Sequence, residues 1–328
     1  MFGQRVAFFE IFCGCMHLTL GVRAMGLCAP DGVDKLYPIG DKPWDLTLAG
    51  DQERCERLLD ELDPLVAHFA PPCTDLCIIG SRPAPGSEGY ERAHSTMKFS
   101  VEQVRRRDSR GSEASLESPL TAATWKLKVV VDEFGSRDQP RAGRFFARPD
   151  LCQFDLKEPV AQSDEYWKKG VVIAATFPEV ALVDVRCDGS HLHRHIRGSV
   201  KTEAGPWKSR AALSAAYPEK LGLAWGLVVC LVSARLSARH LERTRVKTNR
   251  PLDAGPLAEL ARDSACVVAA TPGGLVQHDI LSEPPRPLFG TEVYRASDEV
   301  ATIAEGVVNP WLARLRSGDL SGLQLDPG

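Results

Sequence analysis

Two nearly continuous apolar segments that stop abruptly place the strongest constraint on how this chain can fold. One runs from Arg5 to Gly14 ("RVAFFEIFCG"), and the other runs from Val66 into Pro71-Pro72 ("VAHFAPPC"). An uninterrupted apolar run is typical of a strand that is buried on both faces, as in a parallel sheet. Proline has no amide donor, so the second strand must end there. The pattern therefore predicts a thiol, Cys73, at the end of a buried strand.

Strands and helices alternate along most of the chain, which predicts an α/β fold. Segment 51–62 is amphipathic with acids in its first turn and is typical of a helix. Further elements are expected as follows: a short strand ending near Asp34, a helix ending near Arg107, a strand ending at Glu117–Pro119, a strand pair over 145–155 and 168–177, a strand leading from residue 182 into a His-rich loop, and a long helical segment interrupted near Tyr217-Pro218. This alternation predicts a mostly parallel sheet with helices on both faces.

The composition is that of an ordinary globular protein, with 44% hydrophobic and 25% charged residues among 328. No run of about 18 apolar residues is present, so we expect no membrane span. The N-terminal segment is expected to form a strand and not a signal peptide. Ten cysteines without tight pairing favour a reducing compartment, so we expect an intracellular protein, nuclear or cytoplasmic and not secreted.

The net charge of −3 does not by itself identify a protein that binds polyanions. One basic segment, Val104–Gly111 ("VRRRDSRG"), follows the candidate thiol in the chain. Two interpretations are open for it. The segment is either a loop that contacts a phosphate backbone or a solvated helix end.

Four short motifs, taken in order, resemble those of a known family. They are "EIFCGCMHLT" from Glu10, "WDL" at 44–46, "PPC" ending at Cys73 and "LESP" at 116–119. This order resembles the DNA cytosine-5 methyltransferases over roughly residues 6–230, and most of all the divergent, shortened methyltransferase-like segments in retroelement-type polyproteins of unicellular algae. The resemblance implies a Rossmann-like fold that depends on S-adenosylmethionine, with a reduced recognition region.

The resemblance also implies roles for the residues at the strand ends. Cys73 is expected to be the nucleophile that adds to the C6 position of cytosine, which makes the C5 carbon enamine-like. Glu117 is expected to donate a proton to the ring N3 and would need a raised pKa. The implied substrate-binding residues are Thr74, Lys168 and Lys169. In a duplex, the target base must also be flipped out of the stack.

A second group of residues is implied to hold S-adenosylmethionine. Glu10 is expected on the methionine amine, Asp34 on the ribose, and Asp45 with Leu46 on the adenine. Phe12, Gly14 and Pro72 complete the implied cofactor-binding set. At the glycine turn, Met16 and His17 stand where the family has glycines.

Two other functions stay open. The chain could be a catalytically inactive, nucleic-acid-binding module of a mobile-element polyprotein that has kept the fold. DNA is the expected nucleic acid, but methylation of RNA uses the same set of residues. We expect a methyltransferase-like domain over residues 1–230, whose part 151–216 is the reduced recognition and His-rich region. An extension over 231–328 is expected to begin as a helix and then become irregular.

A possible zinc site lies in "VRCDGSHLHRHIRG". Cys187, His191 and His193 form a C-x3-H-x-H pattern, and histidines two residues apart project to the same face of an extended segment. Cys152 in "LCQFD" is the expected fourth ligand. Such an ion would stabilise a region that has little core of its own. The alternative is a polar surface loop with solvated histidines.

Overall fold

The structure, a computed structural model, describes residues 6–35, 43–77, 84, 86–158, 165–201 and 207–248, and side chains only as far as residue 239. The chain divides into two compact units, Met1–Glu242 and Arg243–Gly328. The domain boundary expected near residue 230 falls inside helix α6 (Glu219–Thr248), and the rest of the expected extension lies outside the described residues.

A five-stranded sheet forms the centre of the first unit, in the order β1-β2-β3-β6-β4. Its strands are β1 (Phe8–Ile11), β2 (Val66–Phe69), β3 (Glu113–Pro119), β4 (Phe145–Ala147) and β6 (Val171–Ala175). Strands β1, β2 and β3 are parallel, and β6 is antiparallel to both of its neighbours, β3 and β4. The expected mixed α/β architecture with a mostly parallel sheet is confirmed.

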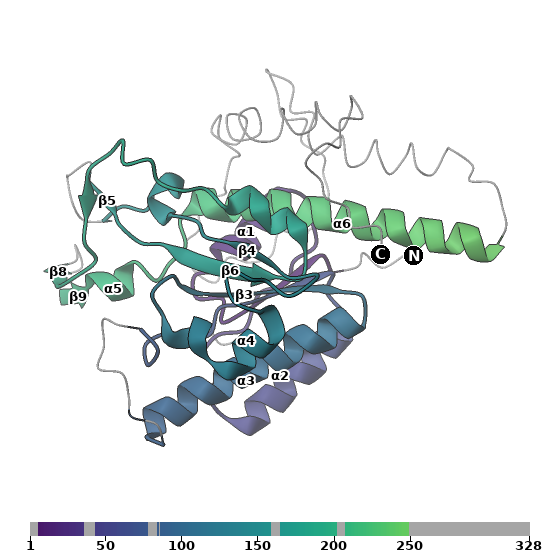
Figure 1. Ribbon diagram of the computed structural model, residues 1–328, viewed down its shortest axis with the longest axis horizontal. Coiled ribbons are helices and arrows are strands. Elements are labelled where there is room, and N and C mark those ends of the chain that lie inside the picture. Colours follow the sequence, from purple (N-terminus) through teal and green to yellow (C-terminus); the bar gives the residue numbers. More distant parts are fainter. Residues whose placement is uncertain are drawn as a thin grey trace, which may run out of the picture. The chain divides into compact units, whose positions relative to one another are not determined.

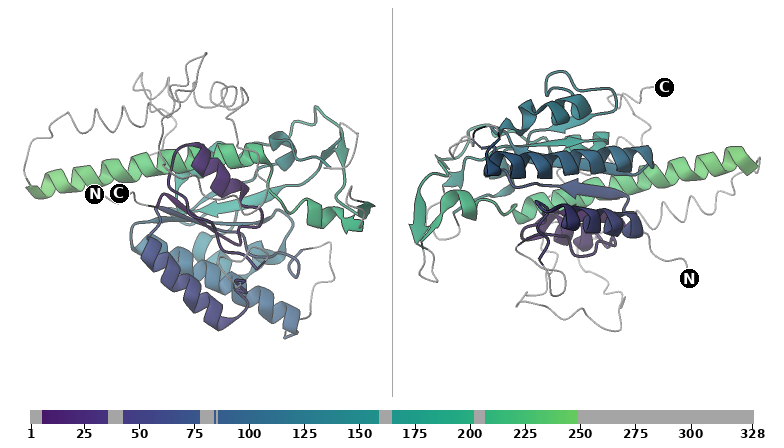
Figure 2. Two further views of the ribbon diagram at one scale, coloured as in Figure 1. Left: turned by 180° about the vertical axis from the view of Figure 1, so that it is seen from behind. Right: turned by 90° about the horizontal axis from the view of Figure 1, so that it is seen from below.

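Helices cover both faces of this sheet, as Figures 1 and 2 show. Helices α1 and α6 lie on one face, and α2, α3 and α4 lie on the other. The bounds are α1 (His17–Ala24), α2 (Ala49–Leu62), α3 (Glu88–Ser109) and α4 (Lys128–Phe134). The helix predicted over 51–62 is thus present and begins two residues earlier.

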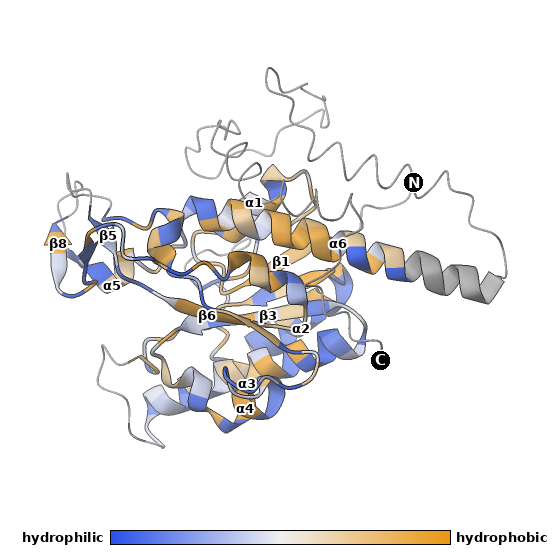
Figure 3. Cartoon of the chain, turned by 45° about the horizontal axis from the view of Figure 1, so that its top comes forward, coloured by the Kyte–Doolittle hydropathy of each residue, from blue (hydrophilic) through white to orange (hydrophobic). Residues whose placement is uncertain are grey.

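Each face of the sheet has its own hydrophobic core, because successive side chains of a strand point to opposite faces. Phe8 packs with Leu18 of α1 and Trp225 of α6, whereas its neighbour Phe9 packs with Leu59 of α2 and other residues of the second core. Figure 3 shows β6 as almost entirely hydrophobic and α3 as a mixture of hydrophobic and hydrophilic residues. The sheet is therefore a buried middle layer, as the apolar runs predicted.

The short helix η1 (Ala123–Lys126) precedes α4. Shorter elements also make up the region expected to serve recognition, 151–216. They are η2 (Leu151–Phe154), β5 (Tyr166–Trp167), η3 (Pro178–Val183), β7 (His193–Arg194), β8 (Ser199–Lys201), β9 (Trp207–Ser209) and α5 (Arg210–Leu213). Strand β5 pairs with β7 in parallel, and β8 pairs with β9 in antiparallel orientation. Helix α5 ends before Pro218, and α6 begins after it, so the predicted interruption is confirmed.

Three sequence expectations about strands were wrong in detail. The strand ending near Asp34 is reduced to one parallel bridge between Ile11 and Val33. Segment 151–154 is a 3₁₀ helix and not part of the strand pair, which is limited to β4 and β6. The segment around residue 182 also forms a 3₁₀ helix, η3. Its Pro178 stands in the first turn, and Val180 and Val183 are buried three residues apart, which suits that helix and not a strand.

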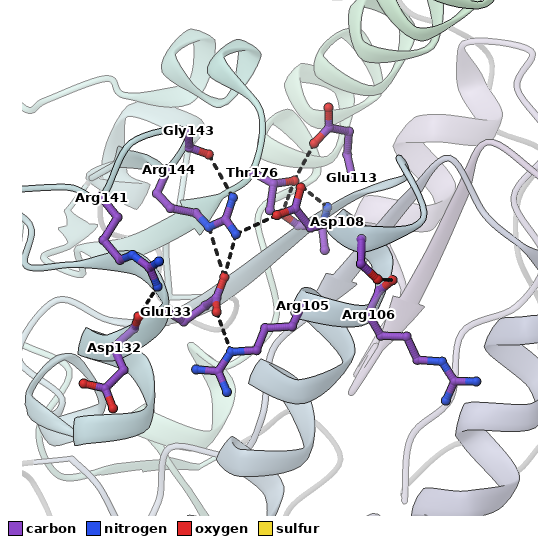
Figure 4. A network of polar contacts seen from close by, with 12 residues as sticks. Arg105, Arg106, Asp108, Glu113, Asp132, Glu133, Arg141, Gly143, Arg144 and Thr176 are labelled. Carbon is purple, nitrogen blue, oxygen red and sulfur yellow. Dashed lines mark hydrogen bonds and ion pairs between the residues drawn. The ribbon is translucent and has the colours of Figure 1, made fainter. Parts of the chain in front are cut away.

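The basic segment Val104–Gly111 is the ion-paired end of α3. It lies just before the first residue of β3, so it is at the edge of the sheet opposite the carboxyl ends of the parallel strands. Arg105 and Arg144 both bind Glu133, which lies between them in Figure 4. The other arginines bind acids of α2 and the residue after it, through the pairs Arg106–Asp60, Arg107–Asp60, Arg107–Asp63 and Arg110–Asp60. The helix-end interpretation is the one that this structure supports.

Helix α6 is built into the core of the first unit. By length and composition alone, its part Glu219–Arg239 could cross a membrane, and it is the one such helix among the described residues. Near the end of that part, Arg235 binds Glu113 of β3 at 2.8 Å and Glu179 of η3 at 2.6 Å. The fully buried side chains of α6 include Trp225, Val228, Val229 and Val232.

Glycines allow α1 and α6 to pack with their backbones in contact. A Cβ atom at Gly21 of α1 would overlap the backbone of Gly222 in α6. A Cβ atom at Gly226, one turn further along, would in turn overlap the carbonyl of Gly21. Residues four apart lie on one helix face, so Gly222 and Gly226 form a single flat surface for α1.

We therefore expect Gly21→Ala to destabilise the protein by about 1–3 kcal/mol, because the added methyl group forces the two helices apart. Gly50→Ala in α2 is a matched control, since no atom lies within 4 Å of a Cβ placed there. Alanine is the better helix former, so the control should gain up to about 1 kcal/mol. Urea unfolding of the three proteins measures both effects, and equal stability of the two variants would contradict the close packing.

Candidate active site

The parallel pairing brings the carboxyl ends of β1, β2 and β3 to one edge of the sheet. Glu10 is paired with His68, and His68 is paired with Ser115, so these three residues form one row across the sheet. Glu117 lies two residues further along β3, and Cys73 follows the end of β2. In open α/β sheets, ligands bind outside the carboxyl ends of the strands. This edge is the candidate active site.

Glu117 is a buried carboxyl group at this edge. The hydroxyl group of Tyr217 donates a hydrogen bond to its Oε2 atom at 2.9 Å. Burial raises the pKa of Glu117, while the nearby positive charge of Lys169 and the hydrogen bond from Tyr217 act in the opposite direction. The net effect favours the protonated form to a higher pH than usual, which is the form a proton donor needs.

Cys73 is half-buried and hydrogen-bonded to a second thiol, Cys77. The hydrogen bond with Cys77, burial and the charge of Glu117 raise the pKa of Cys73, and Lys169 lowers it. The same hydrogen bond lowers the pKa of Cys77. Cys73, Glu117 and Lys169 therefore lie within electrostatic range of one another.

The other two expected substrate-binding residues, Lys168 and Thr74, are exposed. Lys168 precedes Lys169 but is exposed, and its charge acts on His193 in the neighbouring Cys/His cluster. Thr74 is exposed in the turn after Cys73, where the amide of Leu76 donates to the Cys73 carbonyl. Among the described interactions of Glu117, none involves either side chain.

The sequence reasoning missed three residues of the site: His68, Ser115 and Tyr217. His68 is fully buried in β2, its Nδ1 atom lies 2.8 Å from Ser115 Oγ, and its Nε2 atom makes a long contact of 3.5 Å with Tyr217 Oη. Burial lowers the pKa of His68 to about 3, so its ring is neutral. A series of polar contacts thus connects Ser115, His68, Tyr217 and Glu117. The available signal was a histidine inside the apolar run "VAHFA".

Glu10 lies at the same edge and is fully buried. Its Oε2 atom accepts hydrogen bonds from the Thr19 amide at 3.0 Å and the Thr19 hydroxyl at 2.6 Å, at the start of α1. Its Oε1 atom is buried without a donor among the described residues. Burial raises the pKa of Glu10 to about 7. A buried acceptor with no donor is costly unless a ligand supplies one.

The turn between β1 and α1 connects Glu10 to Asp34. The amide of Gly14 donates to Asp34 Oδ2 at 3.0 Å, and the charge of Asp34 contributes to the raised pKa of Glu10. Phe12, Gly14 and Met16 all have positive φ angles, of 62°, 48° and 60°. The structure thus brings Glu10, Phe12, Gly14 and Asp34 together.

A backbone hydrogen bond of 3.4 Å, from the Trp44 amide to the Asp34 carbonyl, holds the segment with Asp45 and Leu46 next to Asp34. The Asp45 carboxylate accepts hydrogen bonds from Lys35 Nζ at 2.6 Å and from the Thr47 hydroxyl at 2.7 Å. The bond from Lys35 is the main cause that lowers the pKa of Asp45. Leu46 is buried. Pro72, the last residue of the expected cofactor set, is exposed beside Cys73.

The four expected metal ligands also lie together. Cys152 comes from η2, Cys187 and His191 from the loop after η3, and His193 from β7. One donor atom from each of the four residues lies within 4.8 Å of all the others. All nine described cysteines, including Cys152 and Cys187, are free thiols.

In comparisons with known proteins, no protein-family model and no curated protein sequence matches the chain.

Glu10→Gln should remove a pH dependence of stability. The pKa of Glu10 rises from 4.5 to about 7 on folding, so the folded state binds this proton more tightly than the unfolded state. The free energy of unfolding should therefore fall as the pH rises through this interval and then stay level. At about 1.4 kcal/mol per pKa unit, the fall is on the order of 3 kcal/mol.

Glutamine still accepts hydrogen bonds from Thr19 and carries no charge. In the variant, the free energy of unfolding should therefore fall much less as the pH rises. Urea unfolding at about pH 5 and about pH 8 measures the difference. An equal fall in both proteins would show that another group titrates.

Proposed function

We propose that the chain is an S-adenosylmethionine-dependent methyltransferase that methylates the C5 carbon of cytosine in nucleic acid, DNA in the first place. The observation that carries this proposal is the convergence of Cys73, Glu117 and Lys169 at the carboxyl edge of the sheet. A thiol beside a buried carboxyl group and a cation is the set of groups that this reaction needs. The resemblance of the four sequence motifs supports the same assignment.

The sheet topology supports the finer fold assignment. Strand β6 is antiparallel and lies between β3 and β4 in an otherwise parallel arrangement. One antiparallel strand within a parallel sheet is also the arrangement of Rossmann-like methyltransferases. A purely parallel nucleotide-binding sheet lacks it.

The residues at the glycine turn fit S-adenosylmethionine. Glu10 Oε1 is a buried acceptor without a donor in the described structure, which suits the methionine ammonium group. Asp34 would hold the ribose, and Asp45 with Leu46 would hold the adenine. Met16 has a φ angle of 60°, so the backbone keeps the left-handed conformation that the family's glycine adopts freely. When bound, S-adenosylmethionine would supply an electrophilic methyl group.

The covalent chemistry would begin at Cys73. Its thiol would lose its proton to solvent, and the positive charge of Lys169 would favour the resulting thiolate. The Cys73 thiolate would then form a bond to C6 of cytosine, while Glu117 donates its proton to N3. The C5 carbon would then be nucleophilic enough to accept a methyl group. Loss of the C5 proton to solvent, departure of Cys73 and return of the N3 proton to Glu117 would restore the ring and the enzyme.

Lys169 stabilises negative charge at both reacting groups. Its ammonium group lowers the pKa of Cys73 and of Glu117, and it also lowers that of Cys77. It would therefore favour the thiolate that attacks and limit how far burial raises the pKa of the acid. Its Nζ atom donates to the Ser214 carbonyl, which holds the side chain in place.

A mechanism-based trap tests the proposal. Duplex DNA of randomised sequence with 5-fluorocytosine, incubated with the protein and S-adenosylmethionine, should give a covalent adduct, because fluorine cannot leave C5 as a proton does. Denaturing electrophoresis detects the adduct. Cys73→Ala should abolish it, and Glu117→Gln should slow its formation by about 100-fold or more, since general acid catalysis contributes about 10²–10⁴-fold.

Cys28→Ala is the matched control, because Cys28 is a half-buried free thiol away from this edge, and it should leave the adduct unchanged. Cys77→Ala should keep the adduct, because the nucleophile Cys73 remains and loses a hydrogen bond that raises its pKa. An adduct that persists in Cys73→Ala and maps to Cys77 would reassign the nucleophile. An adduct with a matched RNA pool alone would assign RNA as the substrate. Binding of nucleic acid without any adduct would support the inactive binding module.

Binding of S-adenosylmethionine is a separate prediction. Calorimetric titration should show binding to the wild type, and Glu10→Gln should weaken it by about 10- to 150-fold, since a hydrogen bond to a charged group contributes about 1.5–3 kcal/mol. The control is Asp31→Asn, because Asp31 is an exposed acid paired with Arg23. No binding to the wild type would exclude a methyltransferase.

A further inference from the structure

The cluster of Cys152, Cys187, His191 and His193 is a second site, separate from the candidate active site. Cys187 Sγ lies 3.7 Å from His191 Nε2 and 3.5 Å from His193 Nε2. Zinc bonds of about 2.3 Å to sulfur and about 2.1 Å to nitrogen, at the tetrahedral angle, place the two ligand atoms about 3.6 Å apart. These two separations match this value, and all four donor atoms lie within 4.8 Å of one another.

The donor set selects the metal and the kind of site. Two thiols and two imidazoles in a tetrahedral arrangement suit zinc, and hard cations such as magnesium or calcium prefer oxygen ligands. Four protein ligands leave no open position for water or substrate, which is typical of a structural and not a catalytic ion.

Groups around the cluster are arranged to support such an ion. The Gly189 amide donates to Cys187 Sγ at 3.3 Å, which stabilises negative charge on the sulfur. The carboxylate of Asp150 accepts a hydrogen bond from the Cys187 amide at 2.9 Å and orients that residue. Hydrogen bonds of this kind commonly orient metal ligands.

The segments that carry the ligands also hold the backbone of the two lysines. On one side, Leu151, next to Cys152, donates its amide to the Lys169 carbonyl at 2.8 Å. On the other side, Lys168 donates its amide to the carbonyl of Arg194, next to His193, at 3.0 Å. Strand β5, which leads into the lysines, pairs with β7, which contains His193.

We propose that this cluster binds one structural zinc ion, which ties β7 and the preceding loop to η2 and thereby holds Lys169 in position at the carboxyl edge. Without the ion, β5 and β7 are joined to each other by only two pairs of residues. Trp167 anchors β5 in the core, but none of residues 184–200 is buried, so a metal centre would supply the attachment that the core does not give to β7 and its loop. The zinc site itself is independent of the proposed methylation, and only the consequence for Lys169 rests on it.

Metal analysis of the full chain, purified in the presence of a non-chelating reductant, tests the ion itself. We expect about one zinc per chain. Cys152→Ser and His193→Ala should each lower the affinity for zinc more than 100-fold, because changes outside the ligand set already cost about 10- to 100-fold. His195→Ala is the matched control, since His195 belongs to the same run but not to the cluster, and it should retain the metal.

Cobalt substitution gives a second readout that does not depend on folding yield. The wild type loaded with cobalt should show the intense visible absorption of a tetrahedral centre and the near-ultraviolet band of thiolate-to-cobalt charge transfer. Cys187→Ser should lose that band in part, because one of two thiolates is removed. Wild-type protein without stoichiometric zinc, or a cobalt spectrum typical of octahedral oxygen ligands, would overturn the proposal.

Hydrogen exchange tests the effect on Lys169. Removal of zinc by a chelator should increase amide exchange in 165–170 and in η2, while β1 and β2 keep their protection. Unchanged exchange over 165–170 in the metal-free protein would overturn the positioning role, even if zinc is present. Neither result depends on the covalent trap, so this proposal and the methylation proposal can fail separately.

Discussion

The parallel pairing of β1, β2 and β3 is the constraint on which the rest of this structure depends. Because the three strands run in one direction, their carboxyl ends meet at one edge, and residues far apart in the sequence become neighbours. The pairing of Glu10 with His68 and of His68 with Ser115 shows that the register is aligned. A shift by one residue would turn all of these side chains to the opposite face.

The ionisable groups buried at this edge differ from those at the opposite edge in their charge partners. At the opposite edge, the arginines of α3 are neutralised by acids of α2 and α4. At the carboxyl edge, Glu10, His68 and Glu117 are buried without an opposite charge bonded to them, and each has a shifted pKa. Such groups cost folding free energy, and they concentrate where a protein binds or transforms a ligand.

The zinc site that we propose and the candidate active site share one short segment, Lys168–Gly170. Its carbonyl and amide groups are held by the neighbours of two cluster residues, while the side chain of Lys169 reaches the candidate site. None of residues 184–200 is buried, so a metal centre would be an efficient way to make this segment rigid. Because all four ligands come from the protein, the ion would hold Lys169 in position and take no part in the reaction itself.

Much of the site could be predicted from sequence, because the relevant residues lie at the ends of strongly patterned segments. The apolar runs predicted β1 and β2, and therefore the place of Glu10 and Cys73. The pattern C-x3-H-x-H predicted three members of the Cys/His cluster. Short, irregular segments were predicted poorly: η3 was expected to be a strand, because apolar residues in a short segment do not distinguish a strand from a 3₁₀ helix.

The sequence by itself determined the strands, their ends and the residue types placed there, because local hydrophobic patterning and proline or glycine decide where an element stops. Only the tertiary structure decided which of these residues meet. Tyr217 bonds to Glu117 from 100 positions away and contacts His68 from 149, and no local pattern records such a contact. The shifted pKa values were likewise decided by folding, because they depend on how deeply each group is buried and on which charges surround it.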